Sequence, residues 1–146
     1  MNDTLKLKGK VVITAYTKDG KVKAKRKVNN LIVTAGKNYL ASLLATDPIN
    51  STTFMKYTAV GTGTNAPSSS DTALQSEHVR TAGTLTSSTN TWTNTTTNIV
   101  TASVAITEAG LFSASTGGTM FSRVTFSAIN LSAGEKITTE WTITFG

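Results

Sequence analysis

The sequence predicts an all-β protein, a β-sandwich or jelly-roll-like fold with an N-terminal hairpin and one packed α-helix. Three observations support this class. Ser and Thr account for 43 of the 146 residues, far above ordinary usage, and the branched Cβ of Thr suits a pleated strand. Turn signals recur about every 8–15 residues between short segments of alternating polarity, as in sandwich folds. One segment alone changes to helical spacing.

Residues 1–30 are predicted as a basic β-hairpin, either an arm or an edge of the same domain, and residues 31–146 as the sandwich domain. Apolar residues alternate along the first strand, at Leu5, Leu7, Val11, Ile13 and Ala15. Asp19-Gly20 marks the turn, because both residue types tolerate positive φ. The return strand alternates Val22 and Ala24 with lysines, so one of its faces is a lysine row.

A helix of about three turns is expected near residues 35–46, lying across a sheet. Its apolar face comprises Tyr39, Leu40, Leu43 and Leu44, which recur at helical spacing. Thr34 is the expected N-cap and Asp47-Pro48 the expected stop.

The remaining chain reads as strands and turns. "TTFMKYTAVG" predicts a strand, and "SDTALQSEHV" a short helical turn capped by Ser70 or Asp71. Two Thr-rich strands meet near residues 88–90, a hairpin turns at Gly117-Gly118, and a turn at Ala133-Gly134 precedes the terminal strand. That strand places Ile137, Thr139, Trp141, Ile143 and Phe145 on one face. The expected core aromatics are Trp92, Phe112, Phe121, Phe126, Trp141 and Phe145, some of which would instead serve a subunit interface.

Catalytic and metal chemistry have little support in the sequence. Cysteine is absent, which excludes disulfides and thiolate metal sites. His78 is the one histidine, and a triad with Ser76 or Asp71 would depend on geometry that the sequence does not show. We expect His78 to be a partly exposed strand residue beside Glu77 and Arg80. We therefore expect no enzyme, no cofactor and no metal, and neither a membrane span nor a signal peptide.

Positive charge is concentrated in the hairpin. Residues 1–30 carry nine Lys or Arg against two Asp, whereas the rest of the chain carries five basic and six acidic residues. The candidate contact residues here are Lys18, Lys21, Lys23, Lys25, Arg26 and Lys27. Three interpretations remain open: a solvated edge strand that lysines protect from pairing, contact with an acidic protein, or contact with nucleic acid. Stacking aromatics are missing apart from nearby Tyr16, so no nucleic acid is expected.

The stretch "YTAVGTGTNAPSSSD" contains the spacing G-x-G-x-x-A, which is typical of dinucleotide-binding loops. Such a site needs a long helix directly after the glycines, and Pro67 with three serines stands there instead. We expect a turn at one end of the sandwich, with glycines in conformations closed to other residues. The candidate residues for contact with another subunit or with a partner protein are Gly61, Thr62, Gly63, Thr64, Asn65 and Pro67.

Three stretches together resemble a group of virion proteins of tailed phages. "KVNNLIVTAGKNYLASLL" is similar to their opening segment, "YTAVGTGTNAPSSSDTAL" to their glycine-threonine loop, and "ITEAGLFSASTGGTMFSRVTF" with "LSAGEKITTEWTITF" to their C-terminal strands. The resemblance spans about residues 28–145, while the lysine-rich hairpin departs from the pattern. Such proteins are virion structural, decoration (cement) or tail-fibre proteins. The resemblance implies a structural role with no catalytic residues.

These observations lead to an expected function. The main hypothesis is a capsid decoration protein, a homotrimer that binds the major capsid protein on the outside of the phage head and stabilises it. The trimer is implied by the resemblance and by head geometry rather than by a residue pattern. The alternative is a tail-fibre, neck or baseplate component with a receptor- or glycan-binding role. Copy number per virion separates the two.

Overall fold

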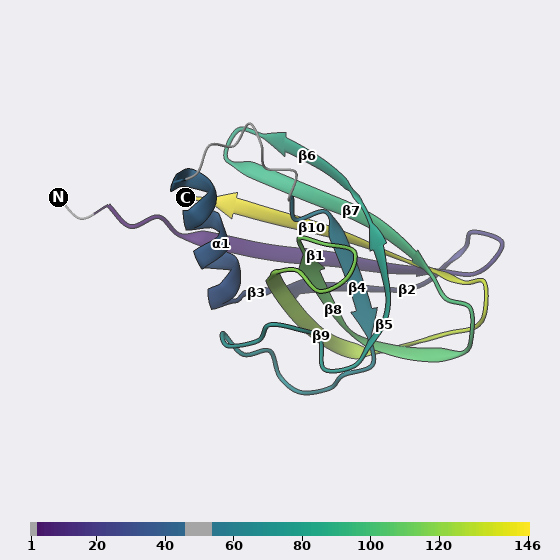
Figure 1. Cartoon of the computed structure of the whole chain (residues 1–146). Helices are drawn as coiled ribbons and strands as arrows, with labels where there is room; N and C mark the ends of the chain where they lie inside the picture. The colour runs from purple at the N-terminus through teal and green to yellow at the C-terminus, as the bar shows by residue number, and fades with distance from the viewer. Residues whose placement is uncertain (1–2, 46–53) are drawn as a thin grey trace.

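Two antiparallel sheets of five strands and one helix make up the computed structural model, which describes residues 3–45 and 54–146. The predicted all-β sandwich is confirmed (Figure 1). The elements are β1 (Leu7–Tyr16), β2 (Val22–Asn29), β3 (Leu31–Ile32), α1 (Thr34–Ala45), β4 (Tyr57–Gly61), β5 (Glu77–Ala82), β6 (Thr84–Ser88), β7 (Thr91–Ile99), β8 (Val104–Phe112), β9 (Met120–Leu131) and β10 (Lys136–Phe145).

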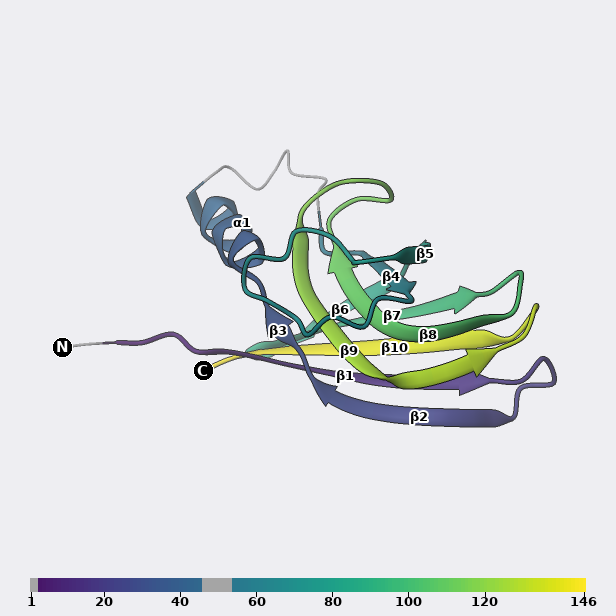
Figure 2. The same cartoon turned by 90° about the horizontal axis from the view of Figure 1, so that it is seen from below.

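The first sheet has the order β2-β1-β10-β7-β6, so the basic hairpin supplies its first two strands. β1 pairs along its whole length with β10, from Leu7 opposite Phe145 to Tyr16 opposite Lys136. The hairpin turn lies where the sequence predicts it, with Gly20 at a φ of 85°. The hairpin is therefore part of the sheet, with β1 inside it and β2 at its rim (Figure 2).

The second sheet has the order β3-β9-β8-β4-β5. The turn between β8 and β9 has two glycines at positive φ, Gly117 and Gly118, as predicted. The strands β6 and β7 meet at a turn whose Thr89 also has a positive φ. Both hairpins follow the turn signals read from the sequence.

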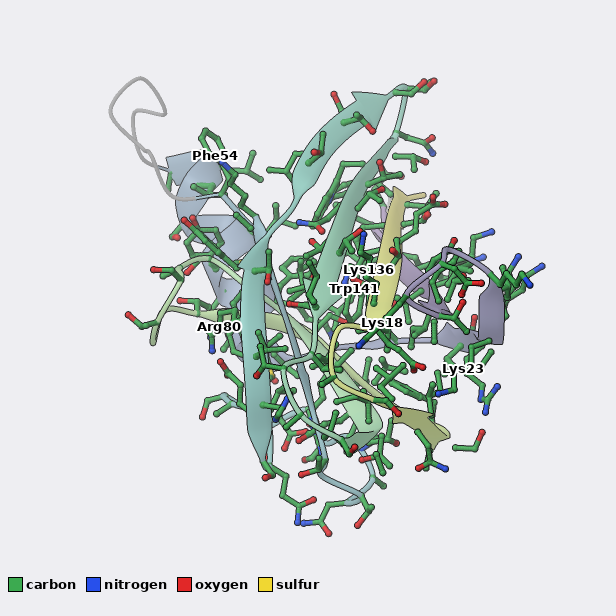
Figure 3. The ribbon with its side chains drawn as sticks, turned by 90° about the vertical axis from the view of Figure 1, so that its right-hand side faces the viewer. Lys18, Lys23, Phe54, Arg80, Lys136 and Trp141 are labelled. Carbon is green, nitrogen blue, oxygen red and sulfur yellow. The ribbon has the colours of Figure 1, made fainter. Side chains whose placement is uncertain are left out.

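The main core lies between the two sheets. On β10 the alternating residues Ile137, Thr139, Trp141 and Ile143 are buried, as predicted, and Phe145 is half-buried. Trp141 lies between the sheets (Figure 3) and its indole N–H donates to Thr58 Oγ1 on β4 at 3.0 Å. Burial of such an aromatic with its polar atom satisfied stabilises the packing of one sheet on the other.

Helix α1 packs near β9 at one end of the sandwich (Figures 1 and 2). Gly36 allows this approach, since a Cβ there would lie 2.5 Å from the Phe121 carbonyl oxygen. The prediction that Thr34 caps the helix is wrong by one residue. Helical hydrogen bonding begins at Val33, whose carbonyl accepts from Lys37 N–H, so Thr34 is already inside the first turn. The expected stop at residues 47–48 lies outside the described residues.

Other expectations fail for identifiable reasons. Leu44 is 84% exposed, because the helix presents only part of its apolar face to the sheet. Leu5 is 66% exposed, since it precedes the first paired residue of β1. No helical turn forms at "SDTALQSEHV"; Asp71 instead closes a tight turn by accepting from Ser68 N–H at 2.9 Å. None of the described helices is long and apolar enough to cross a membrane.

Candidate functional site

The outer face of the first sheet carries a group of lysines at its β2 rim. Alternation along β1 buries Val11 and Ile13 and turns Lys8 and Lys10 outward. On β2 the exposed residues Lys25 and Lys27 stand opposite Thr14 and Val12, which also face outward. We call the surface formed by Lys8, Lys10, Lys25 and Lys27 the basic edge. Within the described residues no ion pair involves any of these four.

Two predicted contact residues of the hairpin instead tie it to the rest of the molecule. Arg26 turns inward, and its Nε donates to Ser127 Oγ on β9 at 2.7 Å. Lys23 Nζ donates to Glu135 Oε2 at 2.7 Å, in the turn before β10. This hydrogen bond is the main reason that the pKa of Glu135 lies below its ordinary value of 4.5. Lys23 and Arg26 thus fasten β2 to the turn before β10 and to β9, whereas Lys25 and Lys27 face outward.

The other two predicted cations lie at the tip of the hairpin. Lys18 is exposed in the turn, beside Gly134 (Figure 3). Lys21 stands 3.8 Å from Asp19 with both side chains largely in solvent, a geometry that contributes little to stability. Neither residue belongs to the flat face of the sheet.

Hydroxyl groups cover the rest of the outer face. Thr97 on β7 and Thr138 on β10 have their oxygens 3.0 Å apart, and Thr86 on β6 pairs with Thr93 on β7 in the same way. Glu140 is the acidic residue that alternation places on this face, opposite Val12 of β1. The face therefore grades from lysine at β2 to threonine at β6.

The glycine-threonine loop, residues 62–76, folds over the outer face of the second sheet. Its Leu74 packs against Phe112 and Met120, forming a second small core. Of the six predicted contact residues, Gly61 and Gly63 are buried, Pro67 is half-buried, and Thr62, Thr64 and Asn65 are exposed. The two glycines therefore offer no surface to a partner.

The expectation that Gly61 and Gly63 adopt unusual backbone conformations is wrong. Neither has a positive φ; both are required because the chain approaches too closely for a Cβ. A Cβ on Gly63 would lie 2.5 Å from Glu108 Oε1, and one on Gly61 would collide with the Ser76 carbonyl. The strand after the loop is β5 and no helix follows, so the nucleotide-binding context is absent from the described structure.

The loop does surround an anion, and that anion belongs to the chain itself. Glu108 is fully buried, and its Oε1 accepts from Gly63 N–H at 2.9 Å and Ser76 N–H at 2.8 Å. Its Oε2 accepts from Gln75 N–H and from Arg123 Nε at 3.0 Å. The carboxylate therefore has four donors and an opposite charge, which is what burial of a charge requires.

Arg123 completes this network. It is 2% exposed and forms a second ion pair, from NH1 to Asp71 Oδ2 at 2.9 Å, while NH2 donates to the Asn65 carbonyl. Thr107 Oγ1 fastens the loop further by donating to the Gly63 carbonyl. The buried pair thus holds both ends of the loop on the sheet, and we assign it a structural role.

The sequence reading missed Glu108 and Arg123 altogether. The signal was one acid within the apolar run "VAITEAGLF" and one arginine within "FSRVTF". A β-bulge decides the position of Glu108, because the ladder between β8 and β9 slips between Ile106 and Glu108. Ile106 faces the core between the sheets, and Glu108 faces the loop.

An apolar pocket of about 290 Å³ lies between α1 and the β6–β7 hairpin. Its lining includes Leu40, Leu43, Leu85, Trp92 and Phe121. Trp92 and Phe121 form an edge-to-face pair with centroids 5.5 Å apart. Phe54 also lines this pocket and lies beside α1 (Figure 3).

The one histidine and the acidic side chains do not gather into a metal-type cluster within the described residues. His78 lies exposed on β5, as expected, next to Glu77, which pairs with Arg80 at 2.7 Å. Arg80 stacks 3.7 Å above the Phe112 ring and donates to the carbonyls of Ala114 and Gly117. Over the described ranges, no three His, Cys, Asp or Glu side chains are grouped to hold a metal ion.

Comparison with protein-family models, curated proteins and solved structures found no match for this chain.

Proposed function

We propose that the protein is a non-catalytic virion structural protein that docks on an acidic protein surface through its basic edge. The observation that carries the proposal is this edge, with Lys8, Lys10, Lys25 and Lys27 exposed on the outer face of the first sheet and free of ion pairs in the described structure. Electrostatic complementarity of this kind accelerates association and sets orientation. The resemblance to tailed-phage proteins supplies the setting, the outside of a phage head.

In this proposal the partner is the major capsid protein, and the protein acts as a decoration (cement) protein, assembled as a homotrimer. It stabilises the shell by bridging neighbouring subunits, which needs a rigid module rather than a catalytic pocket. The ladder between β1 and β10 and the bracing of β2 by Arg26 and Lys23 provide that rigidity at the docking strand.

The test is attachment to heads of the phage that encodes the chain, assembled without it. Lys25→Glu with Lys27→Glu should weaken attachment, and added salt should weaken attachment of the unaltered protein because exposed charges are screened. Lys37→Glu, a charge reversal of an exposed helix residue, is the matched control and should attach normally. Equal attachment of both variants would remove the basic edge from the interface.

The second candidate is a tail-fibre, neck or baseplate component with a receptor- or glycan-binding role. The hydroxyl-rich area over β6, β7 and β10 favours it, because rows of Thr offer both donors and acceptors to a sugar. Quantitative mass spectrometry of purified virions distinguishes the two. Copies in the hundreds support decoration, whereas about a dozen or fewer support the tail.

A further inference from the structure

The strand β2 is the rim of its sheet, and its outer side is open. β2 pairs with β1 and with no other described strand, and no element is drawn beyond it in Figure 2. An open rim presents unpaired backbone N–H and C=O groups at every second residue. The residues that carry them can be identified from the register.

Asn30 N–H donates to the Gly9 carbonyl, which fixes the alternation of hydrogen-bonded pairs along the hairpin. The next hydrogen-bonded pair lies two residues after Gly9 on β1 and two residues before Asn30 on β2, which is Val11 opposite Val28. The residues between, Asn29, Lys27 and Lys25, therefore turn their backbone groups away from β1. The Lys25 carbonyl agrees with this, since it accepts from Arg26 NH1 at 3.0 Å rather than from β1.

The open backbone groups and the exposed lysines belong to the same residues. A strand added to β2 would place residues directly opposite Lys25 and Lys27, with side chains on the same outer face, about 4.5–5.5 Å away at Cβ. Opposite charges at such positions stabilise the pairing and like charges oppose it. Within the sheet, Glu140 is separated from Lys27 by β1, so it leaves these lysines available.

The occupant of this rim is not a second copy of the chain. Two copies of β2 would place lysine rows beside each other, which is how natural edge strands avoid self-association. Furthermore, none of the eight acidic residues in the sequence stands two positions from another, so none of them could face Lys25 and Lys27 as neighbouring acids on one strand face. The chemistry of the rim points to another protein.

We propose that the rim of β2 binds an extended peptide segment of another protein, with Asp or Glu at alternate positions, by adding it to the first sheet as a sixth strand. The lysines that exclude a second copy select this partner. Main-chain hydrogen bonds to Lys27, to Asn29 and to the N–H of Lys25 hold the segment, and the lysine side chains pair with its acidic residues. This inference specifies how the basic edge would recognise its partner. It rests on the proposed function only for the identity of the partner, the capsid surface that would carry such a segment.

The test uses the full-length protein and synthetic peptides of eight residues. One peptide alternates Glu with Thr, the second has the same composition with its four Glu consecutive, and the third is the alternating peptide with N-methylated backbone amides. Binding is followed by titration calorimetry, and the paired groups by amide hydrogen exchange. We expect the alternating peptide to bind and to slow exchange at Lys25, Lys27 and Asn29, since the N–H groups of all three residues face the rim.

The consecutive and N-methylated peptides should bind about tenfold more weakly or worse, because each lost charge pair or ladder bond removes part of the affinity. Lys25→Glu with Lys27→Glu should abolish binding of the alternating peptide, while Lys136→Glu on β10 should not. Circular dichroism of each variant checks that it is folded.

Equal binding of all three peptides, without new amide protection, would overturn strand addition and leave a diffuse basic surface. No binding of the alternating peptide at low salt would overturn it as well. Neither result bears on whether the protein attaches to phage heads or on its copy number there, so failure of this inference is distinguishable from failure of the proposed function.

Discussion

Replacement of Glu108 by Gln tests whether the buried ion pair holds the loop on the sheet. Gln keeps the size of the side chain but has one acceptor oxygen and an NH₂ group in place of two carboxylate oxygens. Either Gly63 and Ser76 on one side, or Gln75 and Arg123 on the other, would then face a donor.

The expected loss of stability depends on which partners Arg123 keeps in the Glu108→Gln variant. Breaking a buried ion pair by removing one partner costs about 3–5 kcal/mol, because the other charge stays buried. Arg123 keeps Asp71 as a partner at 2.9 Å, so the lower end, about 3 kcal/mol, is expected. For a chain of this length that corresponds to a melting temperature lower by roughly 6–12 °C.

Urea denaturation monitored by tryptophan fluorescence measures the free energy of unfolding directly. Glu140→Gln is the matched control, since Glu140 is exposed on β10 and should change stability by about 0.5 kcal/mol or less. Amide exchange should accelerate at Gly63, Gln75 and Ser76 before it does in the strands. A loss below about 1 kcal/mol for Glu108→Gln, with loop protection unchanged, would refute the assigned role.

Three further predictions concern single positions. Gly63→Ala should lower the free energy of unfolding by about 1–3 kcal/mol in urea denaturation, since its Cβ would lie 2.5 Å from that of Gln75; an unchanged midpoint would contradict the close approach. Ionised Glu135 stabilises the fold through Lys23, so its contribution is complete above its ordinary pKa of 4.5 and disappears as pH falls through its lowered pKa. Acid titration should therefore show a shallower stability loss for Glu135→Gln, and parallel curves would count against the pair. Thr89→Gly should raise the free energy of unfolding by about 0.5–1 kcal/mol, and with it the melting temperature, because Thr89 has a φ of 56°. An unchanged melting temperature would show that the turn is unstrained.

Local signals were sufficient for much of the fold. Alternation along "KITTEWTITF" predicted the buried face of β10, and Asp19-Gly20 and Gly117-Gly118 predicted two turns. Both kinds of signal depend on neighbouring residues alone, which is why they could be read without a structure. The short helical turn failed at Asp71 for the opposite reason, since a capping residue there is also a partner of distant Arg123.

The candidate site was predicted in part. The sequence indicated that the hairpin carries the basic charge, but it did not separate Lys25 and Lys27, which face outward, from Arg26 and Lys23, which brace the strand. That division depends on which side of the sheet the second sheet covers. Strand order along the first sheet, and hence the open rim of β2, is likewise a result of pairing between distant segments.

By itself the sequence determined the class of the protein: period-two alternation, Thr-rich strands and glycine turns specify an all-β chain, because these are properties of neighbouring residues. The tertiary structure alone decided what the glycine-threonine loop surrounds. Gly63, Glu108 and Arg123 meet only when β4, β8 and β9 pair and a bulge turns the carboxylate outward. A glycine spacing typical of dinucleotide-binding loops thus holds a carboxylate of its own chain, since burial of that charge requires the amides that the glycines bring close.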